Sequence, residues 1–303
     1  MKIGLQNDRK YFNKFNMINL IKNFSKILSI CLLIVFCNTT FAQQIEKSYF
    51  KVGENDSLYY EAAGSGTTLI FIHDGLLNNE VWDNQFSFFS KNYRVIRYDR
   101  RGYGLSSDAK GEYSNMDDLL SLFTQLNVNS ACLVACSSGG ALAIDFTLEH
   151  SEKVEALVLV GAIVGGFSYT RHMLTRGGHL PKNFKNDMEE NLYYASEDPY
   201  VIYYKNIIAK EKAIELVKKY PSRVYNRPKV EHHDVPAYKR LDEIKVPAII
   251  IVGEFDIPDV HAHAGVINAG IVNSRRYVIP NAGHLAPFEQ PDVFNQIMLN
   301  FLR

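Results

Sequence analysis

Two adjacent serines, Ser137 and Ser138, stand between a short apolar run and two glycines in the stretch LVACSSGGAL. A serine hydroxyl can attack a carbonyl carbon when a base removes its proton and backbone N–H groups stabilise the oxyanion that forms. A nucleophile at the apex of a sharp strand-to-helix turn needs small residues two positions before and after it, because larger side chains would collide there. The stretch therefore predicts a nucleophilic serine on such a turn.

The residues that flank this turn favour Ser137 as the nucleophile. Two positions before Ser137 stands Ala135, whereas the residue two positions before Ser138 is the larger Cys136. A glycine follows each serine at the second position, so the preceding residue decides the preference. Ser138 stays open as the alternative nucleophile. If Ser137 is the nucleophile, the backbone N–H of Ser138, at the positive end of the next helix, is expected to donate to the oxyanion.

A carboxylate and a histidine follow in the order that this kind of site requires, which is serine, then acid, then histidine. Asp256 comes just after a buried predicted strand, and His284 follows the last predicted strand. Because an open α/β sheet gathers its ligands at the carboxyl ends of its strands, both side chains are expected near Ser137. We predict His284 as the base and Asp256 as the acid that orients it, with Glu254 and Asp259 as alternative acids.

The loop that follows the predicted strand at 68–73 is expected to supply a second oxyanion donor. It reads HDGLLNNEVW from residue 73. Gly75 has no side chain that could block a carbonyl oxygen, so its N–H is the predicted donor and that of Leu76 the alternative. His73 is expected to hold this loop in place.

Eight segments have the short apolar or alternating pattern of β-strands. They cover residues 45–52, 57–62, 68–73, 93–99, 129–135, 154–162, 246–253 and 275–280. Helical spacing of apolar residues lies between several of them, at 80–90, 116–127, 138–149 and 292–302. Strands that alternate with helices predict a mostly parallel eight-stranded sheet with helices on both faces.

Residues 163–245 contain no strong strand pattern and are too many for a simple loop, so they predict an inserted helical cap. Three stretches within them are expected to be helical, at 186–196, 199–209 and 211–220. The insertion is rich in tyrosine and phenylalanine, which suits a wall around a small apolar or aromatic group.

The first 42 residues have the order of a secretory signal peptide. Lys22 and Lys26 precede an apolar run at 27–36, and a short polar stretch then ends at Ala42. The run is too short to span a bilayer comfortably, so we expect cleavage after Ala42 rather than a permanent anchor. The mature protein is therefore expected to be exported, either periplasmic or secreted.

Residues 43–303 are expected to form one α/β domain with its insertion. Translation from Met17 would give a shorter signal peptide. Lipid attachment at Cys37 is disfavoured because the bulky Phe36 precedes it. The mature part carries a small excess of acidic residues and no basic run, which argues against a nucleic-acid partner.

The two cysteines of the mature part, Cys132 and Cys136, lie four residues apart on one predicted strand. Their Cα atoms would be about 13 Å apart in an extended strand. That separation exceeds the reach of a disulfide, so none is expected between them. Cys136 is expected to be a buried residue at the strand end rather than a nucleophile, because nothing near it in the sequence suggests an activated thiolate.

Taken together, these motifs resemble those of the α/β-hydrolase superfamily, in the branch that carries a helical cap. The resemblance rests on IHDG at 72–75, YDRRGYGLSS at 98–107, ACSSGG at 135–140, GEFD at 253–256 and NAGH at 281–284. It implies an α/β-hydrolase fold, and it implies that Asp99 and Arg100 belong to a structural turn. Dehalogenases and epoxide hydrolases of this fold carry aspartate at the elbow, so a serine there favours acyl transfer.

The expected function is a serine hydrolase that cleaves a small carboxylic ester through an acyl-enzyme on Ser137, without a cofactor. Lactonase, C–C hydrolase, proline-iminopeptidase-like aminopeptidase and cofactor-free perhydrolase use the same apparatus and stay open as alternatives. A non-catalytic hydrolase-fold binding protein is the alternative from another class. No metal site is expected. Four histidines without a spaced ligand set are expected at the surface or in the cap: His232, His233, His261 and His263.

Overall fold

The computed structural model describes residues 44–225 and 235–303. The predicted signal peptide at 1–42 lies outside the described residues, and so do His232 and His233. Within the described part of the chain, no helix is long and apolar enough to cross a membrane.

Eight strands form one mixed sheet, as predicted, in the order β1-β2-β4-β3-β5-β6-β7-β8. Their bounds are β1 (Glu46–Val52), β2 (Asp56–Ala63), β3 (Thr68–Ile72), β4 (Arg94–Tyr98), β5 (Ala131–Cys136), β6 (Val154–Val160), β7 (Ala248–Gly253) and β8 (Ser274–Ile279). β1 pairs with β2, and β2 with β4, in antiparallel fashion, and all other neighbours are parallel. Every strand begins and ends within two residues of its predicted bounds.

The central strands are apolar along their whole length because helices cover both faces of the sheet. Every residue of β3 is buried, and successive side chains alternate between two cores. Ile70 and Ile72 pack into one core, whereas Leu69 and Phe71 pack into the other.

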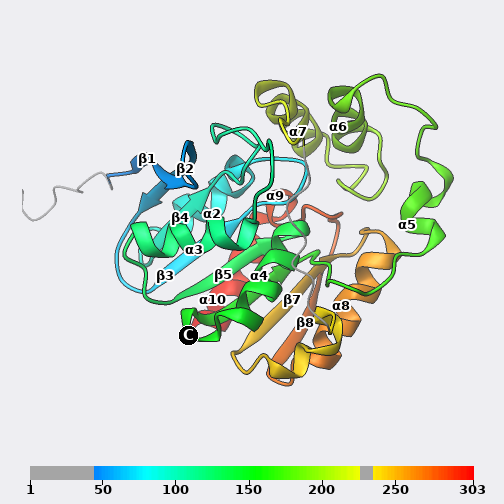
Figure 1. Ribbon diagram of the computed structural model, residues 1–303. Coiled ribbons are helices and arrows are strands. Elements are labelled where there is room, and N and C mark those ends of the chain that lie inside the picture. Colours follow the sequence, from blue (N-terminus) through cyan, green and yellow to red (C-terminus); the bar gives the residue numbers. More distant parts are fainter. Residues whose placement is uncertain (1–43, 226–234) are drawn as a thin grey trace, which may run out of the picture. The chain divides into compact units, whose positions relative to one another are not determined.

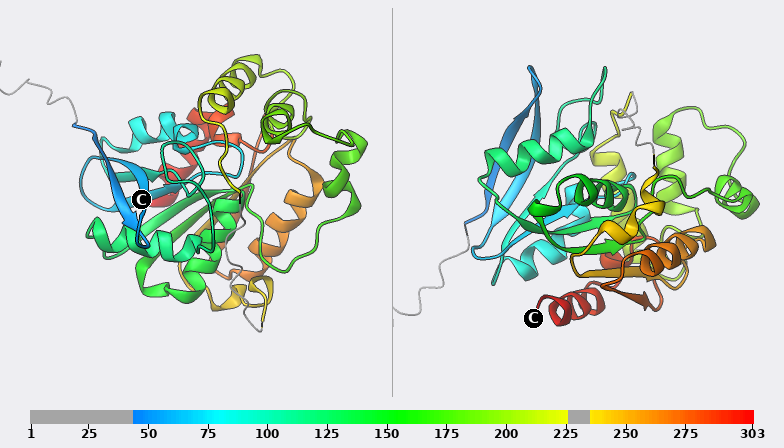
Figure 2. Two further views of the ribbon diagram at one scale, coloured as in Figure 1. Left: turned by 45° about the horizontal axis from the view of Figure 1, so that its top comes forward. Right: turned by 60° about the horizontal axis from the view of Figure 1, so that its bottom comes forward.

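Helices on the two sides of the sheet complete these two cores. α3 (Asn115–Gln125), α4 (Ser138–Glu149) and α8 (Pro258–Gly270) contribute to the first, and α2 (Asp83–Phe89) and α10 (Pro291–Leu302) to the second. Figures 1 and 2 show α3 and α4 on the face of the sheet opposite α10. Short helical turns are η1 (Asn79–Trp82), η2 (Ser151–Lys153), η3 (Arg176–Gly178), η4 (Ala237–Lys239), η5 (Leu241–Glu243) and α9 (Ala286–Glu289).

The chain between β6 and β7 contains α5 (Arg171–Thr175), α6 (Asp187–Ser196) and α7 (Ile207–Lys219). Figure 1 shows α6 and α7 beyond the end of the sheet at which α4 begins. α6 and the larger part of α7 fall on stretches that were predicted to be helical.

The helix predicted over 199–209 is wrong, because most of this segment forms turns instead. Two of its carbonyl groups have partners in another segment, which compete with the hydrogen bonds of a helix. The Asp198 carboxylate accepts hydrogen bonds from the N–H groups of Tyr200 and Val201. The carbonyl oxygens of the same two residues accept N–H groups from the loop of His284. Tertiary hydrogen bonds therefore override the local helical pattern.

Candidate active site

Ser137 occupies a strained turn between β5 and α4. Its φ and ψ are 56° and −119°, a conformation that non-glycine residues rarely adopt. The Ser137 N–H donates to the carbonyl oxygen of Val160 at 2.9 Å, which ties the turn to the neighbouring strand. Strain of this kind persists where the surrounding structure enforces it and is concentrated at functional sites. The observed turn is the elbow that the sequence predicted.

Gly139 shows why this turn needs small neighbours. A Cβ atom at Gly139 would lie 2.5 Å from the carbonyl oxygen of His73, a distance at which backbone would have to move. On the strand side, Ala135 is completely buried. The Ser138 hydroxyl accepts a hydrogen bond from Arg100 at 2.9 Å and does not line the cavity that Ser137 lines. These contacts favour Ser137 over Ser138.

His284 is paired with Asp256. The distance from His284 Nδ1 to Asp256 Oδ2 is 2.8 Å, and the Asp256 side chain is fully buried. The second Asp256 oxygen accepts the N–H of Ile257 at 2.7 Å, which fixes the carboxylate at the start of α8. Neither alternative acid contacts His284: Glu254 accepts a bond from the N–H of Asn281, and Asp259 binds Thr170.

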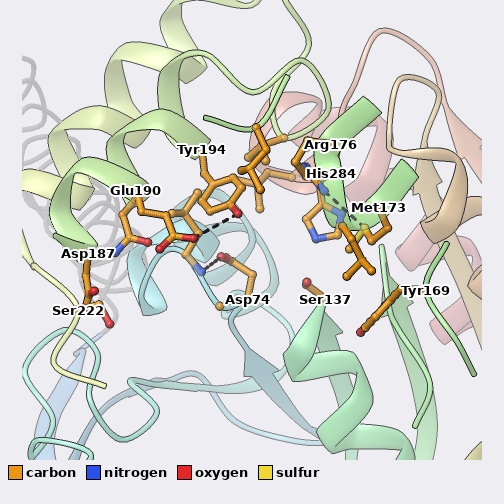
Figure 3. Close-up of a pocket in the computed structure, with 17 residues that line it drawn as sticks. Asp74, Ser137, Tyr169, Met173, Arg176, Asp187, Glu190, Tyr194, Ser222 and His284 are labelled. Atoms are coloured by element: carbon orange, nitrogen blue, oxygen red, sulfur yellow. Dashed lines mark hydrogen bonds between the residues drawn. The ribbon is translucent and has the colours of Figure 1, made fainter. Parts of the chain in front are cut away.

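The electrostatics of His284 suit a base. Burial lowers the pKa of the His284 imidazole, but the Asp256 carboxylate raises it by more, so the pKa lies above its ordinary value. The imidazole is therefore a stronger proton acceptor than a free histidine. Figure 3 shows Ser137 and His284 facing the same cavity. The Ser137 hydroxyl has no hydrogen-bond partner among the described residues, which leaves it available to a substrate or to the imidazole.

Two backbone N–H groups lie beside the serine. A Cβ atom at Gly75 would lie 3.3 Å from Ser138 Oγ, so the Gly75 loop adjoins the first turn of α4. Among the described residues, neither the Gly75 N–H nor the Ser138 N–H has a hydrogen-bond partner. The N–H of Leu76 donates to the Asp74 carboxylate at 2.6 Å. The alternative donor Leu76 is thus engaged, whereas Gly75 and Ser138 are available for an oxyanion.

The loop that carries Gly75 is held from both sides. His73 Nδ1 donates to the carbonyl oxygen of Asp74, and His73 Nε2 accepts the N–H of Arg100. Burial and the nearby Arg100 guanidinium lower the pKa of His73 well below its ordinary value, so this histidine is neutral. The Asp99 carboxylate accepts the N–H groups of Asn79 and Leu105. His73, Asp99 and Arg100 therefore hold loops in place, as expected.

Asp74 is a residue that the motifs did not single out. It is almost completely buried, and its Oδ1 accepts the N–H groups of Leu76 and Leu77. Its Oδ2 has no partner among the described residues, although Asp74 lines the cavity beside Ser137. The only available signal was its place next to Gly75, which says nothing about the direction of its side chain.

The cavity has a volume of about 560 Å³, within the size range of small-molecule sites. Figure 3 shows Tyr169 and Met173 on one side of Ser137 in this view, and Asp187 and Glu190 on the other. The cavity is lined by Asp74, Gly75, Leu76, Ser137, Tyr169, Met173, Leu174, Arg176, Leu180, Asp187, Glu190, Asn191, Tyr194, Val201, Ser222, His284 and Leu285. Most of these residues come from the segment between β6 and β7.

Charge is distributed unevenly around the cavity. Arg176 is neutralised by Asp198, which binds its Nε at 2.6 Å and its Nη2 at 2.9 Å. Glu190 accepts the Tyr194 hydroxyl at 3.4 Å, and burial raises the pKa of Tyr194 to about 12, so the phenol stays protonated. Neither Glu190 nor Asp187 forms an ion pair with any described residue. The lining is therefore acidic.

Glu289 is a second residue that the sequence motifs did not reveal. Its Oε1 accepts the N–H of Gly283 at 2.7 Å, and its Oε2 accepts the N–H of Tyr203 at 2.8 Å. Burial raises the pKa of Glu289 to about 7, against the effect of these N–H donors. Glu289 thus connects the loop of His284 to the segment that precedes α7. Its position five residues after His284 carries no local pattern that indicates this role.

The positions of the two cysteines agree with expectation, whereas those of the remaining described histidines agree only in part. Cys132 and Cys136 are buried free thiols, and burial raises the pKa of Cys136 well above its ordinary value, as suits an inert strand-end residue. The expected surface or cap position of His263 is wrong: it is buried in α8, where Nδ1 accepts the N–H of Val164. His261, on the same helix, contacts Arg276.

Comparisons with known proteins identify relatives of this chain. A family described as the alpha/beta hydrolase family matches residues 69–297. A 2-hydroxy-6-oxononadienedioate/2-hydroxy-6-oxononatrienedioate hydrolase from Paraburkholderia phymatum is 30% identical and covers 81% of this chain and 90% of its own. A 2-hydroxy-6-oxo-6-phenylhexa-2,4-dienoate hydrolase from Comamonas testosteroni is 27% identical, with coverages of 84% and 96%. The solved structure of a thermophilic esterase from Thermogutta terrifontis has a TM-score of 0.70 at 22% identity, with coverages of 85% and 98%.

Proposed function

Because this chain belongs to the alpha/beta hydrolase family, we propose that it is a serine hydrolase that cleaves small carboxylic esters. The observation that carries the proposal is the composition of one cavity. Ser137 on its elbow and His284 paired with Asp256 both face that cavity, beside the free N–H groups of Gly75 and Ser138.

In the proposed mechanism Ser137 Oγ attacks the ester carbonyl carbon while His284 Nε2 takes the hydroxyl proton. Asp256 orients the imidazole and stabilises the imidazolium. The oxyanion receives hydrogen bonds from Gly75 and Ser138, and the imidazolium then protonates the leaving alcohol. Water, deprotonated by His284, cleaves the acyl-enzyme and regenerates the serine.

The lining charges support an ester over the dicarboxylate substrate named for the Paraburkholderia phymatum relative. A dienedioate carries two carboxylates, which would meet Asp74, Asp187 and Glu190 in this cavity. Arg176 already forms a two-point ion pair with Asp198, so it offers little additional compensation. Like charges brought together in a partly desolvated site are repelled. A neutral ester avoids this repulsion.

The segment at 163–245 is proposed to act as the cap of this site. Its residues supply most of the cavity lining, from Tyr169 through Ser222. Aromatic and aliphatic side chains on one side of Ser137 would contact the apolar part of the ester, and the cap would exclude bulk water from the oxyanion.

A substrate panel tests the ester assignment. We expect turnover of p-nitrophenyl esters with short acyl groups, measured by nitrophenol release, to exceed turnover of lactones, aminoacyl anilides and a dienedioate, and to exceed peracid formation. An enzyme that turns over a lactone or anilide but no ester would contradict the assignment. Failure of a fluorophosphonate probe to label Ser137 in the folded protein would instead favour a non-catalytic binding protein.

Export is the second part of the proposal, and it rests on the charged, apolar and polar order of residues 1–42. We expect expression of the full chain in a Gram-negative host to place the protein outside the cytoplasm with Gln43 as its first residue. Fractionation followed by amino-terminal sequencing measures both. Recovery of uncleaved chain from the cytoplasm would contradict export without affecting the catalytic proposal.

A further inference from the structure

Asp198 is a buried carboxylate outside the group formed by Ser137, Asp256 and His284. Only 1% of its surface is exposed. Its Oδ1 accepts the N–H of Tyr200 at 2.8 Å and the N–H of Val201 at 3.2 Å. An aspartate that binds the N–H groups two and three residues ahead fixes the backbone of a turn. Asp198 therefore determines the path of the segment that follows it.

This turn is the surface against which the loop of His284 is built. The N–H of His284 donates to the carbonyl oxygen of Tyr200 at 2.8 Å, and the N–H of Leu285 donates to that of Val201 at 3.2 Å. A Cβ atom at Gly283 would lie 2.6 Å from the Tyr200 oxygen, so only glycine permits this approach. The two residues that Asp198 fixes are thus the two that hold the backbone of His284.

The other contacts of Asp198 lead to the cavity. Arg176 lines the cavity and binds both oxygens of Asp198 through Nε and Nη2. The same guanidinium carbon lies 5.4 Å from the centre of the Tyr200 ring. Loss of the carboxylate would leave a buried cation and two backbone N–H groups without partners, which is a costly arrangement. We expect the turn to shift in response.

We propose that Asp198 is a positioning residue for His284: it holds the turn at Tyr200 and Val201 whose carbonyl oxygens fix the backbone of the base. This inference rests on the proposed function, in which His284 must reach the Ser137 hydroxyl. Asp256 orients the imidazole from one side, and the Asp198 turn sets where the residue itself stands. A displacement of about 1 Å at a reacting group can lower the rate about 100-fold.

Two substitutions separate the functions of the carboxylate, and a third provides the control. Asp198→Asn keeps an oxygen for the two N–H groups but loses the charge that pairs with Arg176. Asp198→Ala loses both. Asp259→Ala removes another buried carboxylate, one that binds the N–H and hydroxyl of Thr170 at the start of α5 and does not contact the His284 loop. All variants are assayed below their unfolding temperatures, which circular dichroism defines.

We expect kcat for a short p-nitrophenyl ester to fall about 100-fold in Asp198→Ala. In Asp198→Asn kcat should fall by less than in Asp198→Ala, and KM should stay within about twofold of the native value in both. Asp259→Ala should keep the native kcat. Asp198→Ala should also weaken the downfield proton resonance of the His284–Asp256 hydrogen bond, which Asp259→Ala should leave intact. If Asp198→Ala does not fold, kcat and the downfield resonance are compared between Asp198→Asn and Asp259→Asn instead, and this comparison tests the proposal.

The inference is overturned if Asp198→Ala keeps the native kcat or changes only KM. It is also overturned if the Asp259 variant loses as much kcat as the Asp198 variant. The resonance requires no substrate. A native protein that hydrolyses no ester would therefore end the proposed function, while an unchanged resonance in the Asp198 variants would end the positioning role.

Discussion

Replacing Ser137 with alanine is expected to lower kcat for ester hydrolysis by a factor of about 10⁴–10⁶. The reason is that the Ser137 hydroxyl is the only proposed nucleophile, and the oxyanion donors alone retain a small part of the acceleration. Initial rates with a short p-nitrophenyl ester measure the loss. Labelling by a fluorophosphonate probe should disappear in the same variant.

The neighbouring residues provide matched controls for this substitution. Ser138→Ala keeps the backbone N–H and removes only a hydroxyl that binds Arg100, so it should retain activity within about tenfold. Cys136→Ala should behave in the same way, because the Cys136 thiol is buried and its pKa is raised. Near-native activity in Ser137→Ala, together with its loss in Ser138→Ala, would transfer the nucleophile to the second serine.

Asp256→Asn is expected to lower kcat/KM by about 10⁴ near neutral pH, because an amide can no longer stabilise the imidazolium or fix the imidazole tautomer. The pH profile should change as well. In the native protein we expect activity to fall as the pH drops through the raised pKa of His284, where the base becomes protonated. Without the carboxylate, burial remains and lowers that pKa. The acidic limb of the variant should therefore move to lower pH.

This shift distinguishes Asp256 from the other carboxylates near it. Glu254→Gln and Asp259→Asn remove charges that bind Asn281 and Thr170 instead of His284. Both variants should keep the native acidic limb and most of the native rate. A profile of kcat/KM from about pH 5 to 9 measures all three variants. If the acidic limb of the kcat/KM profile stayed at its native pH in the Asp256 variant, another group would set the pKa of the base.

Local patterns in the chain were sufficient for the order and kind of the strands. Central strands such as β3 and β5 are covered on both faces, so they must be continuously apolar, and such runs stand out between turn residues. The elbow was equally visible, because its geometry allows only small residues beside Ser137. The two expectations that failed, a helix over 199–209 and an exposed or cap position for His263, depended on surroundings that no local pattern describes.

By itself the sequence determined the sheet and the sharp turn at Ser137, and it predicted Ser137, Asp256 and His284 as the catalytic set, since steric limits and apolar burial act on neighbouring residues. Only the tertiary structure decided which groups hold that set in place. Asp198 binds N–H groups only two and three residues ahead, but the carbonyl oxygens of that turn bind the distant loop of His284. Glu289 likewise binds the N–H of Tyr203, which lies 86 residues away in the chain. Their roles follow from hydrogen bonds between segments that meet only when the chain is folded, so no spacing along the chain could reveal them.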